Sequence, residues 1–217
     1  MTHLTTRIIW QEHEQLTAMF RSMLQLHSRH REKGTLPDFE ALRAMLFYID
    51  EFSEQRHHRR ESELLFPKLR ARAPLSRELF DRLDHDHGRG ERKIRDLERA
   101  LLGFEMMGEP RRRAFGQAIE RYVDFYLAHM ALEEQKLLPL AERVLTEADW
   151  AQLDAAFSDS RDPPTGREGD ANYHALFNRI ADRLPVAPIG PGLPGEAGRL
   201  ASPVSGRNRL RTHAPPE

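Results

Sequence analysis

Apolar residues recur along the first 145 residues at alternating spacings of four and three, which places them on one face of an α-helix. The first stripe is Ile9, His13, Leu16, Phe20 and Met23. Thr5 or Thr6 is expected to cap the start of this helix, and Lys33-Gly34 to mark its end. A histidine therefore occupies one position of an otherwise apolar stripe.

Three further stripes follow, each bounded by helix start and stop signals. Pro37 opens the second helix, Ser76 is expected to cap the third, and Gly108 and Pro110 separate the third from the fourth. The inward positions of the second helix are Leu42, Leu46, Ile49, Ser53, His57, Glu61 and Leu64. Those of the third are Phe80, Leu83, His87, Gly90, Ile94, Leu97, Leu101 and Phe104. Those of the fourth are Phe115, Ile119, Tyr122, Tyr126, His129 and Glu133. Four long helices with three short loops predict an all-α protein, an up-down-up-down four-helix bundle.

The chain changes in character after residue 145. Thr146-x-x-Asp149 is a capping box that predicts a short helix, and residues 172–184 have the pattern of one more amphipathic helix. The expected organisation is a metal-binding bundle at 1–145, a helical appendage with a linker at 146–184, and a Pro/Gly/Arg-rich disordered tail at 185–217.

One motif occurs twice in the chain, starting at His57 and again at His129. Each copy reads His-x3-Glu, then a leucine pair, then a proline six residues after the glutamate. Positions i and i+4 lie on one face of a helix, so each copy directs an imidazole and a carboxylate the same way. Each proline is expected to end or kink its helix beyond that pair.

Counting residues from the loops places the histidines at one level of the bundle. His13 and His57 lie at nearly equal sequence distances on either side of Gly34, and His87 and His129 at equal distances on either side of Gly108. A rise of ~1.5 Å per residue puts all four ~31–35 Å from a loop. The residues expected in one buried cavity are His13, His57, Glu61, His87, His129 and Glu133.

A metal centre accounts for this group better than a core does. A single histidine on an apolar helix face is usually a hydrogen-bonded core residue, and that alternative applies to each one singly. Six ionisable groups at one level carry a severe desolvation cost unless a metal compensates for it. Six ligands suit two ions bridged by Glu61 and Glu133, and nitrogen and oxygen donors without sulfur favour iron, with manganese next.

The layer one helical turn away is expected to form a small pocket lined by Leu16, Ser53 and Gly90. Tyr126 is expected either to donate a hydrogen bond to a small bound ligand or to fill the core. Glu91 is a candidate seventh ligand or outer-shell acceptor, with a surface carboxylate as the alternative.

The remaining histidines are expected to lie outside the site. His58 is one residue from His57 and is therefore rotated ~100° away on the helix, and His85 should also point away from the cavity. Glu63 and Glu134 are expected to be solvated or to support ligands rather than to bridge ions. The histidines expected at the surface are His3, His27, His30, His174 and His213.

Composition excludes several chemistries. The chain has no cysteine, which rules out disulfides, thiolate zinc sites, iron–sulfur ligation and cysteine nucleophiles. Its net charge is −1, so no overall field attracts nucleic acid or a membrane, and the basic tail is better explained by disorder. Because it has neither an apolar leader nor an apolar run long enough to span a membrane, a cytoplasmic protein is expected.

The combined motif resembles the hemerythrin-like, or HHE cation-binding, family over residues 5–145. Its elements are His13, His57-x3-Glu61 with Leu-Phe-Pro, Asp86-His87-x-x-Gly90, and His129-x3-Glu133 with Leu-Leu-Pro. The resemblance implies a four-helix bundle holding two non-haem iron ions with an oxo or hydroxo bridge, ligated by the six residues named above. Oxygen-carrying members have a second histidine one turn after the third-helix ligand, where this chain has Glu91.

Three functions are compatible with such a site. The first is a protein that binds or senses O2, NO or peroxide, or that handles iron and redox stress. The second is a di-iron enzyme with peroxidase or ferroxidase activity, for which the only candidate general acids or bases are Tyr126 and Glu91. The third is a metal-stapled protein-interaction module. The sequence favours the first and leaves protein partners and oligomeric state unspecified.

Overall fold

The computed structural model describes residues 3–158 and 178–180, and within these ranges all regular structure is helical. This confirms the predicted all-α class for the described residues. In chain order the elements are α1 (Leu4–Glu32), α2 (Phe39–Tyr48), η1 (Ile49–His57), α3 (His58–Arg60), η2 (Glu61–Leu65), α4 (Phe66–Arg72), η3 (Pro74–Ser76), α5 (Arg77–Met107), α6 (Glu109–Leu132), η4 (Glu133–Leu137), α7 (Leu138–Val144) and α8 (Glu147–Ser158).

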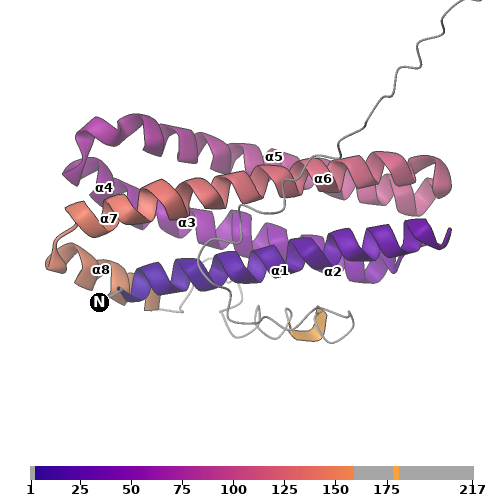
Figure 1. Cartoon of the computed structure of the whole chain (residues 1–217), viewed down its shortest axis with the longest axis horizontal. Helices are drawn as coiled ribbons and strands as arrows, with labels where there is room; N and C mark the ends of the chain where they lie inside the picture. Colours follow the sequence, from indigo (N-terminus) through magenta and orange to yellow (C-terminus); the bar gives the residue numbers. More distant parts are fainter. Residues whose placement is uncertain (1–2, 159–177, 181–217) are drawn as a thin grey trace, which may run out of the picture.

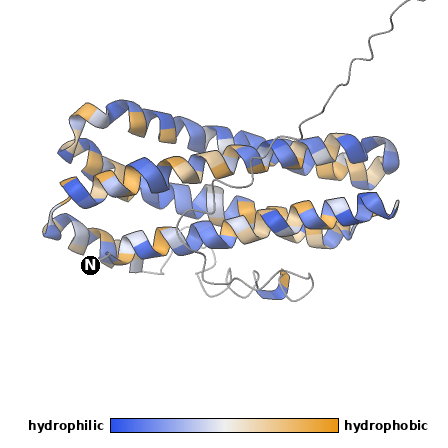
Figure 2. Cartoon of the chain, in the orientation of Figure 1, coloured by the Kyte–Doolittle hydropathy of each residue, from blue (hydrophilic) through white to orange (hydrophobic). Residues whose placement is uncertain are grey.

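Long helical rods lie side by side along the molecule (Figure 1). The chain runs along α1, returns through α2, α3 and α4, runs back along α5 and returns through α6 and α7. α5 packs closely on α6, α1 lies against α6, and α2 lies against α5. Hydrophobic and hydrophilic residues alternate along each rod, as Figure 2 shows, so each helix can bury one face against its neighbours.

The buried apolar residues fall into two clusters along the bundle. One cluster contains Leu16, Met23 and Phe104 and lies toward the turns that contain Gly34 and Gly108. The other contains Ile9 of α1, residues at the start of α5, and residues of α4, α7 and α8. Because α1 passes from one cluster to the other at His13, a buried polar layer separates them.

Glycines close the two long hairpins. Gly34 and Gly108 have φ of 63° and 67°, a left-handed conformation that favours glycine. Gly108 ends α5 and precedes α6, which has Pro110 in its first turn, as the sequence predicts. The side chain of Asp38 caps α2 by accepting a 3.0 Å hydrogen bond from the amide of Ala41.

The first helix begins earlier than predicted. α1 begins at Leu4, and neither Thr5 nor Thr6 is its N-cap. The cap is supplied instead by Asp154 of α8, whose carboxylate accepts hydrogen bonds from the amides of Leu4 (3.3 Å) and Thr5 (2.8 Å). Two orphan donors of the helix are therefore satisfied by a residue far away in sequence.

Each motif proline was expected to end or kink its helix, but neither Pro67 nor Pro139 ends it. Each follows a π-helical segment, η2 or η4, that begins at Glu61 or Glu133 respectively. A proline inside an α-helix lacks the amide hydrogen and clashes with the carbonyl four residues earlier. A widened turn moves that carbonyl, so the helix continues, and π turns of this kind occur often at functional sites.

The predicted helix after Thr146 is confirmed as α8. Thr146 and Asp149 form the capping box, with the amide of Thr146 donating to the Asp149 carboxylate at 3.0 Å. Trp150 and Phe157 are buried in the second apolar cluster. Of the predicted helix at 172–184, only 178–180 is described, and it is helical; the linker and the tail lie outside the described residues. Among the described helices, none is both long and apolar enough to cross a membrane.

Candidate metal centre

The six predicted ligands all lie in the polar layer between the two apolar clusters. They come from every rod of the bundle, and their exposed fractions are 7% or less. The π turns begin or end at three of them, since η1 ends at His57 while η2 and η4 begin at Glu61 and Glu133. The internal repeat of the sequence therefore reappears as a repeated turn geometry at the site.

The donor atoms form two groups that share both carboxylates. One group is His13, His57, Glu61 and Glu133, and the other is Glu61, His87, His129 and Glu133. Within each group the ligand atoms all lie within 4.8 Å of one another. We call these the first and the second cation position. Two positions that share Glu61 and Glu133 match the arrangement expected for two bridged ions.

Three of the four imidazoles are held from behind by a polar partner on Nδ1. His13 donates to Glu134 at 2.9 Å, and His57 donates to Glu12 at 2.7 Å. His87 donates at 2.9 Å to the hydroxyl of Ser62, which itself donates to Asp84. In each ring this leaves Nε2 facing the cluster, where it can bind a metal once that nitrogen is unprotonated.

The inward-facing atoms of the cluster lack hydrogen-bond partners. Both carboxylate oxygens of Glu61 and of Glu133 are buried without one, as is Nε2 of His87 and of His129. Glu133 approaches the Nε2 atoms of His13 and His129 to 3.2 Å each. Buried polar atoms left unpaired are costly, and cations coordinated by these same atoms would satisfy all of them. The residues present therefore fit a metal centre.

The two carboxylates have opposite electrostatic environments. Burial raises the pKa of Glu61 well above its ordinary value, and the neighbouring charge of Glu133 raises it further. Burial acts in the same direction on Glu133, but contacts with His129 and two other histidines outweigh it and hold the pKa of Glu133 well below its ordinary value. Without metal, burial and the second carboxylate therefore favour the neutral form of Glu61, while the surrounding histidines favour the charged form of Glu133.

The imidazoles also have pKa values shifted in opposite directions. Burial acts to lower the pKa of His13, but the close contact with the Glu133 carboxylate and the hydrogen bond to Glu134 raise it to about 9. Burial lowers the pKa of His57 and of His87. A cation in the first position would therefore replace a proton on His13, while the other two rings are already neutral.

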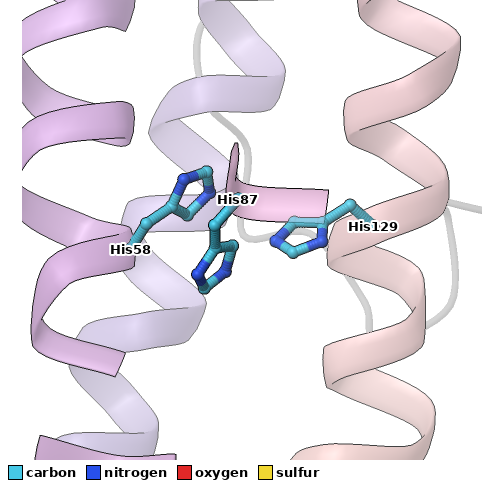
Figure 3. Close-up of side chains that lie close together, drawn as sticks. All are labelled: His58, His87 and His129. Carbon is cyan, nitrogen blue, oxygen red and sulfur yellow. The ribbon is translucent and has the colours of Figure 1, made fainter. Parts of the chain in front are cut away.

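His58 does not point away from the site, contrary to the prediction. It is 4% exposed, and its ring stacks on that of His87 with centroids 3.9 Å apart. Figure 3 shows His58, His87 and His129 converging from three helices, and a ring nitrogen of each lies within 4.8 Å of the others. A rotation of ~100° on this helix brings His58 to His87 and His129 rather than to solvent, because neighbouring helices surround it.

The predicted pocket residues are all buried, and Ser53 is linked to His58 through Tyr126. Ser53 donates a 2.9 Å hydrogen bond to the hydroxyl of Tyr126, which lies 3.3 Å from Nε2 of His58. Leu16 and Gly90 are also buried. Glu91, by contrast, has a side chain that is 49% exposed and faces Arg95 at 3.9 Å, which is the surface alternative considered for it.

Two further polar residues are placed differently from the prediction. His27 is 6% exposed and packs against Gly116 of α6 rather than lying at the surface. Glu12 was not predicted to have a role, yet it is buried between His57 and Arg60. No sequence spacing signals this contact, because Glu12 and its partners lie on different helices. Glu63 is exposed, and Glu134 supports His13, as predicted.

The described fold and its site define a class: a helical bundle with a buried histidine–glutamate cluster that could hold metal ions. The family model described as the Hemerythrin HHE cation binding domain matches residues 4–141. The chain therefore belongs to the hemerythrin family, and the resemblance inferred from its motifs is confirmed. Comparisons with curated proteins and with solved structures gave no match.

Proposed function

We propose that this protein holds two non-haem iron ions in an up-down-up-down bundle formed by residues 1–145, and that it binds or senses O2, NO or peroxide. The observation that carries the proposal is the pair of buried carboxylates, Glu61 and Glu133, that belong to both cation positions. Their four oxygens have no hydrogen-bond partner. Two ions bridged by them would satisfy these oxygens, and iron is favoured by the nitrogen and oxygen donors, with manganese as the alternative.

The first position has its ligands fixed in place. Glu12 and Glu134 hold the His57 and His13 rings, and they keep the Nε2 atoms directed inward. Hydrogen-bonded carboxylates behind imidazoles also make the rings better electron donors to a metal. We expect this position to bind its ion tightly.

The side of the site toward Tyr126 is suited to a small ligand. Bound iron would supply redox chemistry and a coordination position for such a ligand. The Tyr126 hydroxyl and Ser53 are polar groups there, and Phe20 of the apolar cluster packs against the Tyr126 ring with centroids 5.4 Å apart. A wall of this kind excludes water, and one hydroxyl can donate to an oxygen or nitrogen atom of a diatomic ligand.

A di-iron enzyme with peroxidase or ferroxidase activity is the second candidate. It is favoured by the buried Tyr126 phenol, which could donate a proton near the metals. Catalytic turnover of peroxide or of ferrous iron by the loaded protein would support this candidate over a sensor. The role as a metal-stapled interaction module would instead be supported if a protein partner bound the metal-free and metal-loaded forms equally well.

Loading with ferrous iron tests the proposal. Metal-free protein would be titrated with Fe2+ under anaerobic conditions, iron per chain measured, and the optical spectrum recorded as oxygen is admitted. We expect two irons per chain and new near-ultraviolet charge-transfer bands. Bands that reverse when oxygen is removed would support reversible binding. Irreversible oxidation would favour the enzyme, and one iron or none would contradict the two-ion site.

A further inference from the structure

We propose that His58 is a third imidazole ligand of the second cation position, beside His87 and His129. This inference rests on the proposed function, because it assigns a ligand to one of the two positions. It makes the two positions unequal: the first has two imidazoles and the second has three, and the carboxylates of Glu61 and Glu133 are common to both.

The geometry of three rings supports the assignment. The centroid of His58 lies 3.9 Å from that of His87 and 5.2 Å from that of His129. A ring nitrogen of each lies within 4.8 Å of the other two, and all three residues are buried. Figure 3 shows the three rings close together, coming from different helices. Three imidazoles with approaching nitrogen atoms form a set of donors that a transition-metal ion accepts.

The backbone brings His58 to this point. α3 is only three residues long and lies between η1, which ends at His57, and η2, which begins at Glu61. The widened turns on both sides change the direction in which successive side chains leave the helix. As a result, His57 reaches the first position, and His58 reaches the second.

Tyr126 provides the partner that an imidazole ligand needs behind it. Its hydroxyl receives a hydrogen bond from Ser53 and lies 3.3 Å from a His58 ring nitrogen. A ligand histidine commonly uses one ring nitrogen on the metal and the other on a hydrogen-bond partner. The alternative is that His58 only completes this hydrogen-bond chain, as a core residue, without contacting a metal.

His58→Ala and His58→Gln separate these roles. Each variant, wild type and the exposed-histidine control His85→Ala would be titrated anaerobically with Fe2+ against a chromogenic chelator, with iron per chain measured. We expect wild type and the control to bind two irons. In both His58 variants the second iron should bind about 100-fold more weakly, with the first retained. His57→Ala should show the reverse pattern, with loss of the first position.

Rescue by added imidazole distinguishes a ligand from a structural residue. In His58→Gly, free imidazole should enter the vacated space and restore binding of the second iron. In His57→Ala, whose second position keeps all of its ligands, added imidazole should not change iron binding at that position. Circular dichroism and thermal unfolding of the metal-free variants would verify that each is folded. Should folded His58→Gln bind both irons with wild-type affinity, the assignment is overturned. A wild-type protein that binds fewer than two irons would instead overturn the proposed function itself.

Discussion

The Nε2 atoms of His13 and His57 lie 3.3 Å apart in the interior of the bundle. The rings are held by carboxylates in a crossed arrangement. Glu12, which precedes His13 in sequence, accepts from His57, and Glu134, which follows Glu133, accepts from His13. The orientation of each ring therefore depends on a residue of another helix, and the first cation position is assembled only when those helices pack.

Glu12→Gln and Glu134→Gln should each weaken metal binding at the first position by about 10–100-fold. The amide keeps the size of the side chain but removes the charge that orients and polarises the imidazole. Chelator competition with Fe2+ would measure the affinity. Glu14→Gln is a matched control, because Glu14 is exposed on the same helix. Equal affinity in Glu12→Gln and in this control would contradict the role given to Glu12.

Glu61→Gln and Glu133→Gln should have different effects on the metal-free protein. Because burial and Glu133 raise the pKa of Glu61 and favour its neutral form, replacing it by the neutral amide should change the free energy of unfolding by no more than about 1 kcal/mol. Glu133 is charged and contacts His13 and His129, so Glu133→Gln should lower the free energy of unfolding by about 3 kcal/mol. Urea unfolding of the metal-free proteins would measure both.

The same two variants should agree in their metal content. Neither should load two irons, because each lacks a carboxylate that both cation positions share. Elemental analysis after anaerobic loading would give the metal content. Two tightly bound irons in either variant would show that its carboxylate does not bridge, whatever the result of unfolding.

Metal affinity should rise with pH between about 6.5 and 9. In the metal-free protein the pKa of His13 is raised from 6.5 to about 9 by its two carboxylate partners, which outweigh burial. Protonated His13 therefore stabilises the metal-free fold fully below pH 6.5, and that contribution is lost as the pH rises through about 9. Because a ligand histidine must be neutral, iron competes with this proton.

Titrations at pH 7, 8 and 9 would test this dependence, with release of protons followed by an indicator dye. Each proton released on binding should change the affinity about tenfold per pH unit. Glu134→Gln removes one of the groups that raise the pKa of His13, so its dependence above pH 7 should be shallower. A wild-type affinity that is flat from pH 7 to 9 would show that His13 does not release a proton on loading.

Gly116→Ala should destabilise the bundle even though alanine favours helices. A Cβ at position 116 would lie 2.6 Å from Nε2 of the buried His27. The clash should cost about 1–3 kcal/mol, more than the gain of about 1 kcal/mol from helix propensity. In a His27→Ala background the same change should become stabilising, and thermal unfolding of the four proteins would give the coupling. Additive effects would contradict the contact.

Local rules were enough for most of the fold. The four-three spacing predicted the helices, and glycine and proline predicted the hairpins at Gly34 and Gly108, because both act within a few residues. The His-x3-Glu spacing placed Glu61 and Glu133 with their histidines for the same reason. The predicted cap of α1 was wrong because the residue that caps it, Asp154, is 150 residues from Leu4 in the sequence.

The sequence by itself determined that His13, His57, His87 and His129 share one level, because residue counts from short loops fix height along parallel rods. It could not determine whether a residue next to a predicted ligand, such as His58, also faces the site. That depends on the π turns before and after His58, and on which helix packs opposite. Only the tertiary structure therefore turned His58 inward, paired Glu12 with His57, and left Glu91 at the surface.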